Sequence, residues 1–135
     1  MLARTTSPVH QARHQRGSAL TVVAVVLAFL VIVSVAYTAL VLTWSYSEGE
    51  RSGLLLKFSR KGWLCKTWEG ELHIVTSPGV MPQIWHFTVR DEVVAAQASA
   101  ALGKRVVLHY TEHKGVPTSC FGETSYFVDG VRVGE

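Results

Sequence analysis

The amino-acid sequence predicts one N-terminal transmembrane helix followed by a small, mainly-β domain. Three observations support this class. Residues 19–44 contain no charged side chain, alternating apolar and polar residues recur in short runs after residue 53, and a single Ala-rich run interrupts them. The 135 residues leave about 90 after the apolar run, which is enough for one small domain with a thin core.

The apolar run is long enough to cross a bilayer. A hydrocarbon core about 30 Å thick needs roughly 20 apolar residues in a helix, whereas a signal-peptide core has about 7–15. The run Ala19–Trp44 has 26 residues and ends in a tryptophan suited to the headgroup layer. A cleaved leader is the alternative, because Ser34 and Ala36 are small enough for a cleavage site, but the apolar run continues past them. We therefore predict a transmembrane helix over residues 18–44.

Charges beside the predicted span indicate its orientation. Residues 1–17 hold three arginines and no acidic residue, which is typical of a disordered basic tail. From residue 45 onward, ten Lys and Arg balance ten Asp and Glu, so the excess positive charge belongs to the tail. The positive-inside rule then favours a signal anchor with its N-terminus inside and its C-terminal domain outside. The lipid bilayer is the expected partner of residues 19–44.

The rest of the chain is predicted as a linker and one β domain. Residues 45–53 are polar, contain two glycines and predict a linker; residues 54–135 predict the domain. Asp91 and Gly103 are placed as the N-cap and the stop of a short Ala-rich helix. The predicted elements are strands over 54–59, 63–75 and 83–90, a helix over 91–103, and strands over 105–113 and 125–133.

The order β-β-β-α-β-β is that of an OB-like five-stranded barrel, which carries its helix between the third and fourth strands. Gly70, in the middle of the second predicted strand, indicates a bulge or a sharp bend of the kind that small closed sheets need. An open antiparallel sheet with one covering helix is the alternative architecture.

Three segments carry a resemblance to a known family. They are KGWLCKTWEGEL (61–72), VRDEVVAAQASAALGKRVVLHY (89–110) and CFGETSYFV (120–128). With them the chain resembles a family of small bacterial single-span membrane proteins without established function, over roughly residues 44–132. Some members of that family carry the name 6-phosphogluconate dehydrogenase. The resemblance implies a bacterial inner-membrane location and confers no activity.

A nicotinamide-dependent dehydrogenase is excluded by the residues themselves. A dinucleotide site needs a strand, a Gly-x-Gly-x-x-Gly turn and a helix whose N-terminus receives the pyrophosphate. The 11 glycines never adopt that spacing. The predicted helix begins at Asp91 and Glu92, whose charges would repel a phosphate. We predict no cofactor.

A candidate binding surface follows from aromatic and acidic residues near two predicted turns. OB-folds bind ligands with residues on their strand faces and loops. Two tryptophans, Trp68 and Trp85, are predicted to fill the core. Because the predicted domain has no net charge, we expect no nucleic-acid partner, and a sugar, a peptide or a protein fits better. The candidate surface consists of Trp63, Glu69, Glu71, Phe121 and Glu123.

The two cysteines, Cys65 and Cys120, both fall in the predicted domain. A disulfide between them is permitted if the domain lies outside the cytoplasm, because disulfides persist in oxidising compartments. Two unpaired thiols in a cytoplasmic domain remain the alternative. A reactive Cys120 assisted by a histidine is a third possibility, although its sequence neighbours give little reason for a lowered thiol pKa.

Four histidines are predicted to face outward from the strands. Their spacing matches no zinc-ligand motif, and two histidines four apart on a strand are too distant to share one ion. We therefore predict no metal site. The four are His73, His86, His109 and His113.

The sequence as a whole predicts a membrane-anchored, non-enzymatic binding or interaction module at the bilayer surface. Another membrane or envelope protein is its expected partner. The alternative is a small enzyme that uses Glu69 and Glu71, or Cys120 with a nearby histidine. Two carboxylates on one strand can perform acid–base chemistry, but neighbouring positions on an exposed strand face are usually solvated surface.

Overall fold

The computed structural model of the protein describes residues 15–75 and 77–134. Contacts divide the chain into two compact units, one ending at Tyr37 and the other beginning at Thr38, and each is considered by itself. The predicted basic tail lies outside the described residues as far as residue 14.

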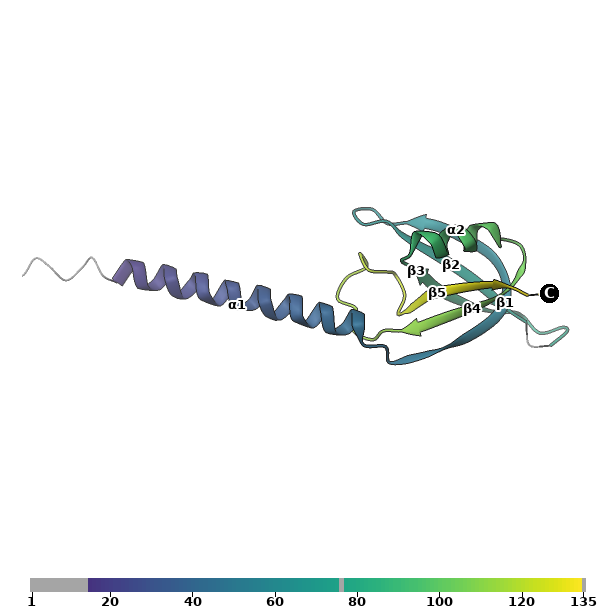
Figure 1. Cartoon of the computed structure of the whole chain (residues 1–135), viewed down its shortest axis with the longest axis horizontal. Helices are drawn as coiled ribbons and strands as arrows, with labels where there is room; N and C mark the ends of the chain where they lie inside the picture. The colour runs from purple at the N-terminus through teal and green to yellow at the C-terminus, as the bar shows by residue number, and fades with distance from the viewer. Residues whose placement is uncertain (1–14, 76, 135) are drawn as a thin grey trace, which may run out of the picture. The chain divides into compact units, whose positions relative to one another are not determined.

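The first unit is made by most of helix α1 (Gln15–Thr43), which begins before the predicted start of the span (Figure 1). The segment Ser18–Thr43 is long and apolar enough to cross a membrane, and its most apolar part is not buried by other parts of the described chain. Large side chains such as Phe29 and Ile32 are about two-thirds exposed, at 63% and 65%. Such a helix needs an apolar environment, as a membrane anchor or a signal sequence has.

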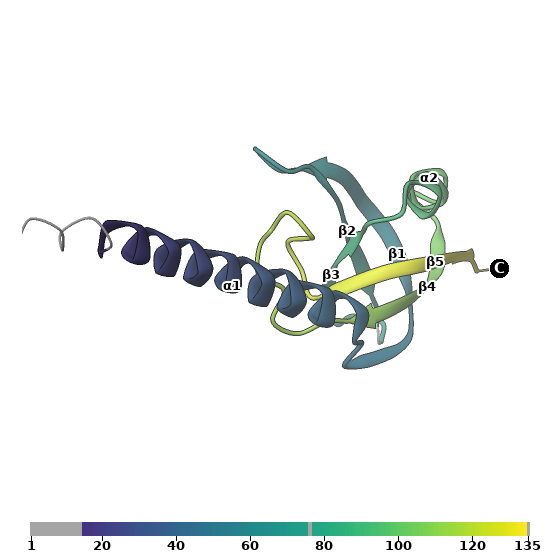
Figure 2. The same ribbon diagram turned by 60° about the vertical axis from the view of Figure 1, so that its left-hand side comes forward.

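The second unit contains a five-stranded barrel and one short helix. Figure 1 and Figure 2 show the strands wrapping round one interior, with helix α2 outside the ring of strands. The order along the chain is strand, strand, strand, helix, strand, strand, as predicted. The elements are β1 (Ser47–Lys61), β2 (Thr67–Ile74), β3 (Gln83–Val89), α2 (Glu92–Ala100), β4 (Arg105–Glu112) and β5 (Tyr126–Val133).

The barrel closes because β1 is long enough to pair with two strands. Its first half runs antiparallel to β4 and its second half antiparallel to β2. A short parallel contact between β3 and β5, at Thr88 opposite Phe127, completes the ring β1-β2-β3-β5-β4. The predicted OB-like barrel is confirmed, and the alternative of an open sheet is wrong.

The predicted linker over residues 45–53 is wrong from Ser47 onward, where β1 begins. The first part of β1 lacks the apolar–polar alternation that predicts a strand, because its inward positions are not apolar. A Cβ on Gly49 would lie 3.3 Å from the hydroxyl of Tyr110, and one on Gly53 would lie 2.7 Å from the carbonyl oxygen of His73. Glycine at both positions lets neighbouring strands approach closely, but it removes the alternation that marks a strand.

Of the two features predicted at Gly70, a bulge or a sharp bend, the bulge is wrong. The register break lies in β1, between Leu55 and Lys57, so that Leu55 and Phe58 both point to the interior. Gly70 sits in regular pairing opposite Phe58 and is needed for space instead. A Cβ there would lie 2.2 Å from the ring of Phe87.

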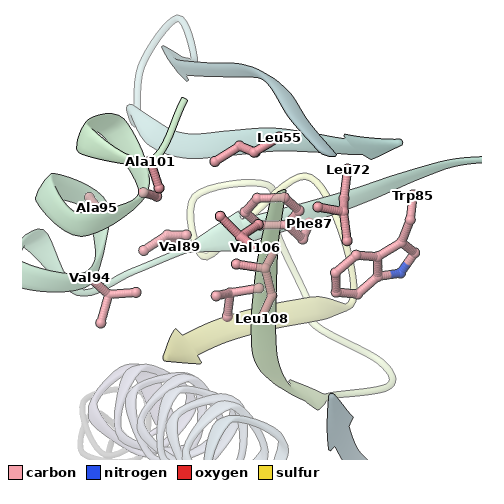
Figure 3. Packing of buried hydrophobic residues seen from close by; sticks show 12 residues of the cluster. Leu55, Leu72, Trp85, Phe87, Val89, Val94, Ala95, Ala101, Val106 and Leu108 are labelled. Carbon is pink, nitrogen blue, oxygen red and sulfur yellow. The ribbon is translucent and has the colours of Figure 1, made fainter. Parts of the chain in front are cut away.

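The core fills the barrel with side chains from every strand. Figure 3 shows Leu55, Phe87 and Leu108 gathered between the strands, and all three are fully buried. Farther along the interior, Trp85, Tyr110 and Tyr126 meet edge to face, with ring centroids 5.1–5.7 Å apart. The guanidinium carbon of Arg51 lies 4.9 Å from the centre of the Trp85 ring, so a cation covers this aromatic end of the core.

Helix α2 seals the barrel with small side chains. Asp91 is its N-cap, as predicted: the carboxylate accepts hydrogen bonds from the backbone N–H groups of Val93 and Val94 at 2.7 and 3.1 Å. Ala95 and Ala98 are buried, so the helix axis can approach the strands closely. Past the helix end, the Gly103 N–H donates to the Leu55 carbonyl at 2.7 Å and ties the chain to β1.

The last turn of α1 belongs to the second unit and is held there by His113. This histidine was predicted to face outward, but it is only 4% exposed. Its Nδ1 lies 2.8 Å from the Val41 carbonyl oxygen, one of the helix-end acceptors that lack a partner within the helix. The Tyr46 N–H donates to the Glu112 carbonyl at 2.7 Å, so the chain enters the barrel within three residues of the helix end.

Candidate functional site

Two loops meet beside β2 and form the candidate site. The β1–β2 loop comprises residues 62–66 and the β4–β5 loop comprises residues 113–125; together they are called the loop pair here. In the structure a disulfide joins Cys65 in the first loop to Cys120 in the second, with their Cα atoms 4.9 Å apart. The corresponding loops of OB-folds, with the face of strands two and three, bind oligonucleotides and oligosaccharides.

Glu69 holds the second loop against the barrel. Its predicted place on an exposed surface is wrong, since the residue is only 5% exposed. Its carboxylate accepts hydrogen bonds from the hydroxyls of Thr67 and Thr88, both at 2.7 Å. It also accepts one from the Glu123 backbone N–H at 3.1 Å. The Thr88 hydroxyl lies a further 2.9 Å from that of Thr124, so one carboxylate organises a network of hydroxyls.

Two large apolar side chains project from the loop pair into solvent. Trp63 and Leu64 are 101% and 90% exposed, although both fall within the strand predicted over residues 63–75. The reason is that β2 begins only at Thr67, so the residues before it belong to the loop. Neighbouring exposed apolar residues on a loop are typical of a contact surface.

A groove of about 350 Å³ runs beside Trp63 and is called the Trp63 groove here. Both loops contribute to it, and both cysteines of the disulfide are among its lining residues. Its volume falls within the range usual for small-ligand sites. The lining residues are Gly62, Trp63, Leu64, Cys65, Thr67, Ser119, Cys120 and Glu123.

A second depression, of about 300 Å³, collects the acidic residues. Glu69, Glu71 and Glu123 line it, together with Lys61 and His86. The Nζ of Lys57 lies 2.7 Å from Glu71 Oε1, and this hydrogen bond, with the charge of Lys57, lowers the pKa of the Glu71 carboxyl. Glu71 is therefore held as a carboxylate.

The structure brings four of the five candidate surface residues together around these two depressions. Phe121 lies in a third, smaller one of about 210 Å³, beside Lys66, Trp68 and Arg90. Sequence reasoning missed the hydroxyl groups. Thr67 and Thr124 belong to the Lys-Thr-Trp-Glu-Gly-Glu and Gly-Glu-Thr runs that carry the family resemblance, and these runs prove to be the two halves of the Glu69 network. The residues that carry the family resemblance were therefore the sequence signal that could have pointed to these threonines.

The groups named for the alternative enzyme are engaged in other contacts. Glu69 is enclosed by three donors and Glu71 is ion-paired, so neither is placed as a proton donor. Cys120 is bonded to Cys65 and in this state offers no thiolate.

The histidines do not assemble. Within residues 15–75 and 77–134, no three His, Cys, Asp or Glu side chains are grouped to hold a metal ion. His109 pairs instead with Asp129, its Nδ1 lying 2.5 Å from the carboxylate. That hydrogen bond, together with the charges of Asp129, Glu48 and Glu50, raises the pKa of His109.

The fold and the loop pair define a small OB-like domain that follows an apolar helix. The chain belongs to a family described as a domain of unknown function (DUF8785), whose model matches residues 44–130. No curated protein matches the chain.

Among solved structures, the chain is similar to Rim1, a mitochondrial single-stranded DNA binding protein from S. cerevisiae. The two share 9% sequence identity with a TM-score of 0.50, over 67% of this chain and 95% of Rim1. At this identity the likeness shows the fold. The prediction that nucleic acid is excluded as a partner is wrong, because a single-stranded DNA binding protein has this same fold. A zero net charge for the whole domain does not describe the charge around one loop.

Proposed function

We propose that the chain is a membrane-anchored, non-enzymatic binding module that presents the loop pair outside the cytoplasm. Helix α1 is the anchor, retained in a bacterial inner membrane with its N-terminus inside. The three arginines before the span favour this orientation. The loop pair binds the ligand or partner, with the barrel as a rigid support.

One observation carries the proposal: a disulfide joins the two loops that OB-folds use for binding. Such a bond persists in oxidising compartments and is rare in the cytoplasm. It also holds the two sides of the Trp63 groove at a fixed spacing, which reduces the entropy lost when a ligand binds.

Reporter fusions test the orientation. Alkaline phosphatase fused after Glu135 should be active, and a cytoplasmic fluorescent reporter at the same position should be dim. The opposite pair of signals would overturn the proposal. An epitope at the N-terminus, followed in membrane fractions, separates the anchor from a cleaved leader, because a leader would lose the epitope from the mature chain.

A second candidate function is single-stranded nucleic acid binding. The observation that favours it is Trp63, fully exposed in the loop between Lys61 and Lys66, on a fold shared with a single-stranded DNA binding protein. An exposed indole beside cations can stack on bases. Binding of a dT12 oligonucleotide that weakens steeply with salt and is lost in Trp63→Ala would support it.

A further inference from the structure

The described residues that line the Trp63 groove combine an aromatic platform with hydroxyl and carboxylate groups, and none of them is Lys or Arg. We propose that the groove binds an uncharged oligosaccharide. This inference rests on the proposed function and names the ligand class of its loop pair.

The platform is the indole of Trp63. Among the described residues, none hydrogen-bonds to this ring or stacks on it, in contrast to Trp68, which stacks on Phe58 at 5.2 Å and donates to Glu92 at 3.1 Å. A flat apolar face left in water next to a groove is a ready contact for another apolar face. The C–H face of a pyranose ring is such a surface, and its hydroxyls then point sideways toward the groove walls.

The groove walls offer groups that match those hydroxyls. The Thr67 hydroxyl donates its proton to Glu69 at 2.7 Å, so its oxygen remains free to accept from a ligand. Ser119 can donate and accept, and the exposed Glu123 carboxylate can accept two hydrogen bonds. A polyol supplies both donors and acceptors at close spacing.

The two walls are fixed in advance. The disulfide joins them at Cys65 and Cys120, and the hydrogen bond from the Glu123 N–H to Glu69 anchors the far wall to β2. A ligand therefore meets a preorganised groove and need not order the loops.

Charge decides between the two ligand classes that OB-folds accept. Within the part of the chain that the structure describes, the lining includes the Glu123 carboxylate and neither Lys nor Arg. Lys61 and Lys66 line the two flanking depressions instead. Phosphate-bearing ligands depend on direct neutralisation by cations and would meet the Glu123 charge here. An uncharged sugar has no such cost.

The test is calorimetric titration of the full chain in phosphatidylcholine nanodiscs. The probes are cellotetraose, chitotetraose and maltotetraose, with dT12 as the competing ligand class. We expect saturable binding of at least one tetrasaccharide. Trp63→Ala should weaken that binding at least about tenfold, the effect typical of an aromatic hot spot.

Two further variants separate the chemistry from general damage. Glu123→Gln should weaken sugar binding only a few-fold, because an amide oxygen still accepts a hydrogen bond, whereas it should strengthen dT12 binding. Val93→Ala removes a side chain on α2 that is 67% exposed and lies outside the groove, and it should leave both affinities unchanged.

Three results would overturn the assignment: no heat from any tetrasaccharide, tetrasaccharide binding that survives Trp63→Ala, or dT12 binding with silent tetrasaccharides. The reporter fusions measure the proposed function separately. If the fusions place the domain outside the cytoplasm but no sugar binds, only the proposed ligand class is wrong. If the fusions place the domain in the cytoplasm, the proposed function is wrong, whatever the titrations show.

Discussion

The barrel core and the loop pair are held together by different forces. In the core, Phe87 and Leu108 are fully buried, and α2 adds small alanines that exclude water. In the loop pair, Trp63 is fully exposed, and order comes from the Glu69 hydrogen bonds and one disulfide. Burial acts in any compartment, whereas a carboxylate network and a disulfide respond to pH and to redox state. We therefore expect that the loop pair can lose its order while the barrel core stays folded.

The largest effect is expected from Phe87→Ala. The Phe87 ring packs against Trp85 and Phe58, with centroids 5.5 and 6.3 Å away, and fills the space that Gly70 leaves. Its loss should lower the free energy of unfolding by about 3–5 kcal/mol in denaturant titrations. Ile84→Ala, on the same strand but 48% exposed, is the matched control and should cost much less. Similar losses from both would contradict the assigned core.

Removing the disulfide should come next. The bridge closes a loop over a sequence separation of 55 residues, and Cys65→Ser with Cys120→Ser should cost about 2–4 kcal/mol. Hydrogen exchange should rise in residues 113–125 while the strands stay protected. Thiol labelling of the wild-type chain should require reductant. Ready labelling without it would show that the bridge is absent and would remove the support for an oxidising compartment.

Glu69→Gln should have a smaller effect, about 1–3 kcal/mol, because the amide cannot accept from three donors as the carboxylate does. The matched control is Glu71→Gln, two positions along β2, which loses an ion pair with the half-exposed Lys57 and should cost at most about 1 kcal/mol. Thermal melts with the disulfide intact would check the order. If Glu71→Gln lowered the melting temperature more than Glu69→Gln did, the Glu69 network would not be what holds the loop.

The smallest effect is expected at His109, on the surface of β4. Because Asp129 raises its folded-state pKa, the pair stabilises the barrel fully below the unfolded pKa near 6.5, and this contribution is lost as the pH rises through the folded value. For a pair this exposed, the stabilisation should be under about 1 kcal/mol. His109→Asn should flatten the stability profile on the alkaline side of pH 6.5. An unchanged profile would show that the pair contributes nothing.

Patterns of neighbouring residues predicted the helices and strands, whose formation depends largely on local interactions. The apolar run gave α1, period-two alternation gave four of the strands, and Asp91 gave the start of α2. Contacts between distant segments could not be read in this way. Glu69 lies on the outward side of β2 but hydrogen-bonds to a loop 54 residues later, and His113 hydrogen-bonds to the Val41 carbonyl, 72 residues earlier. Aromatic and charged residues near turns are a local signal, and they led to the candidate surface, whose role in binding stays a prediction.

The brief passage from α1 to β1 has a consequence for how such a module would work. Trp44, Ser45 and Tyr46 are the whole connection, about 10 Å when extended. If α1 is a membrane anchor, as we propose, so short a connection would restrict the domain to molecules that arrive at, or are attached to, the same surface. For those molecules the encounter is nearly two-dimensional, and the effective concentration can reach millimolar. A ligand whose affinity for the isolated domain in solution is weak would then still occupy the site.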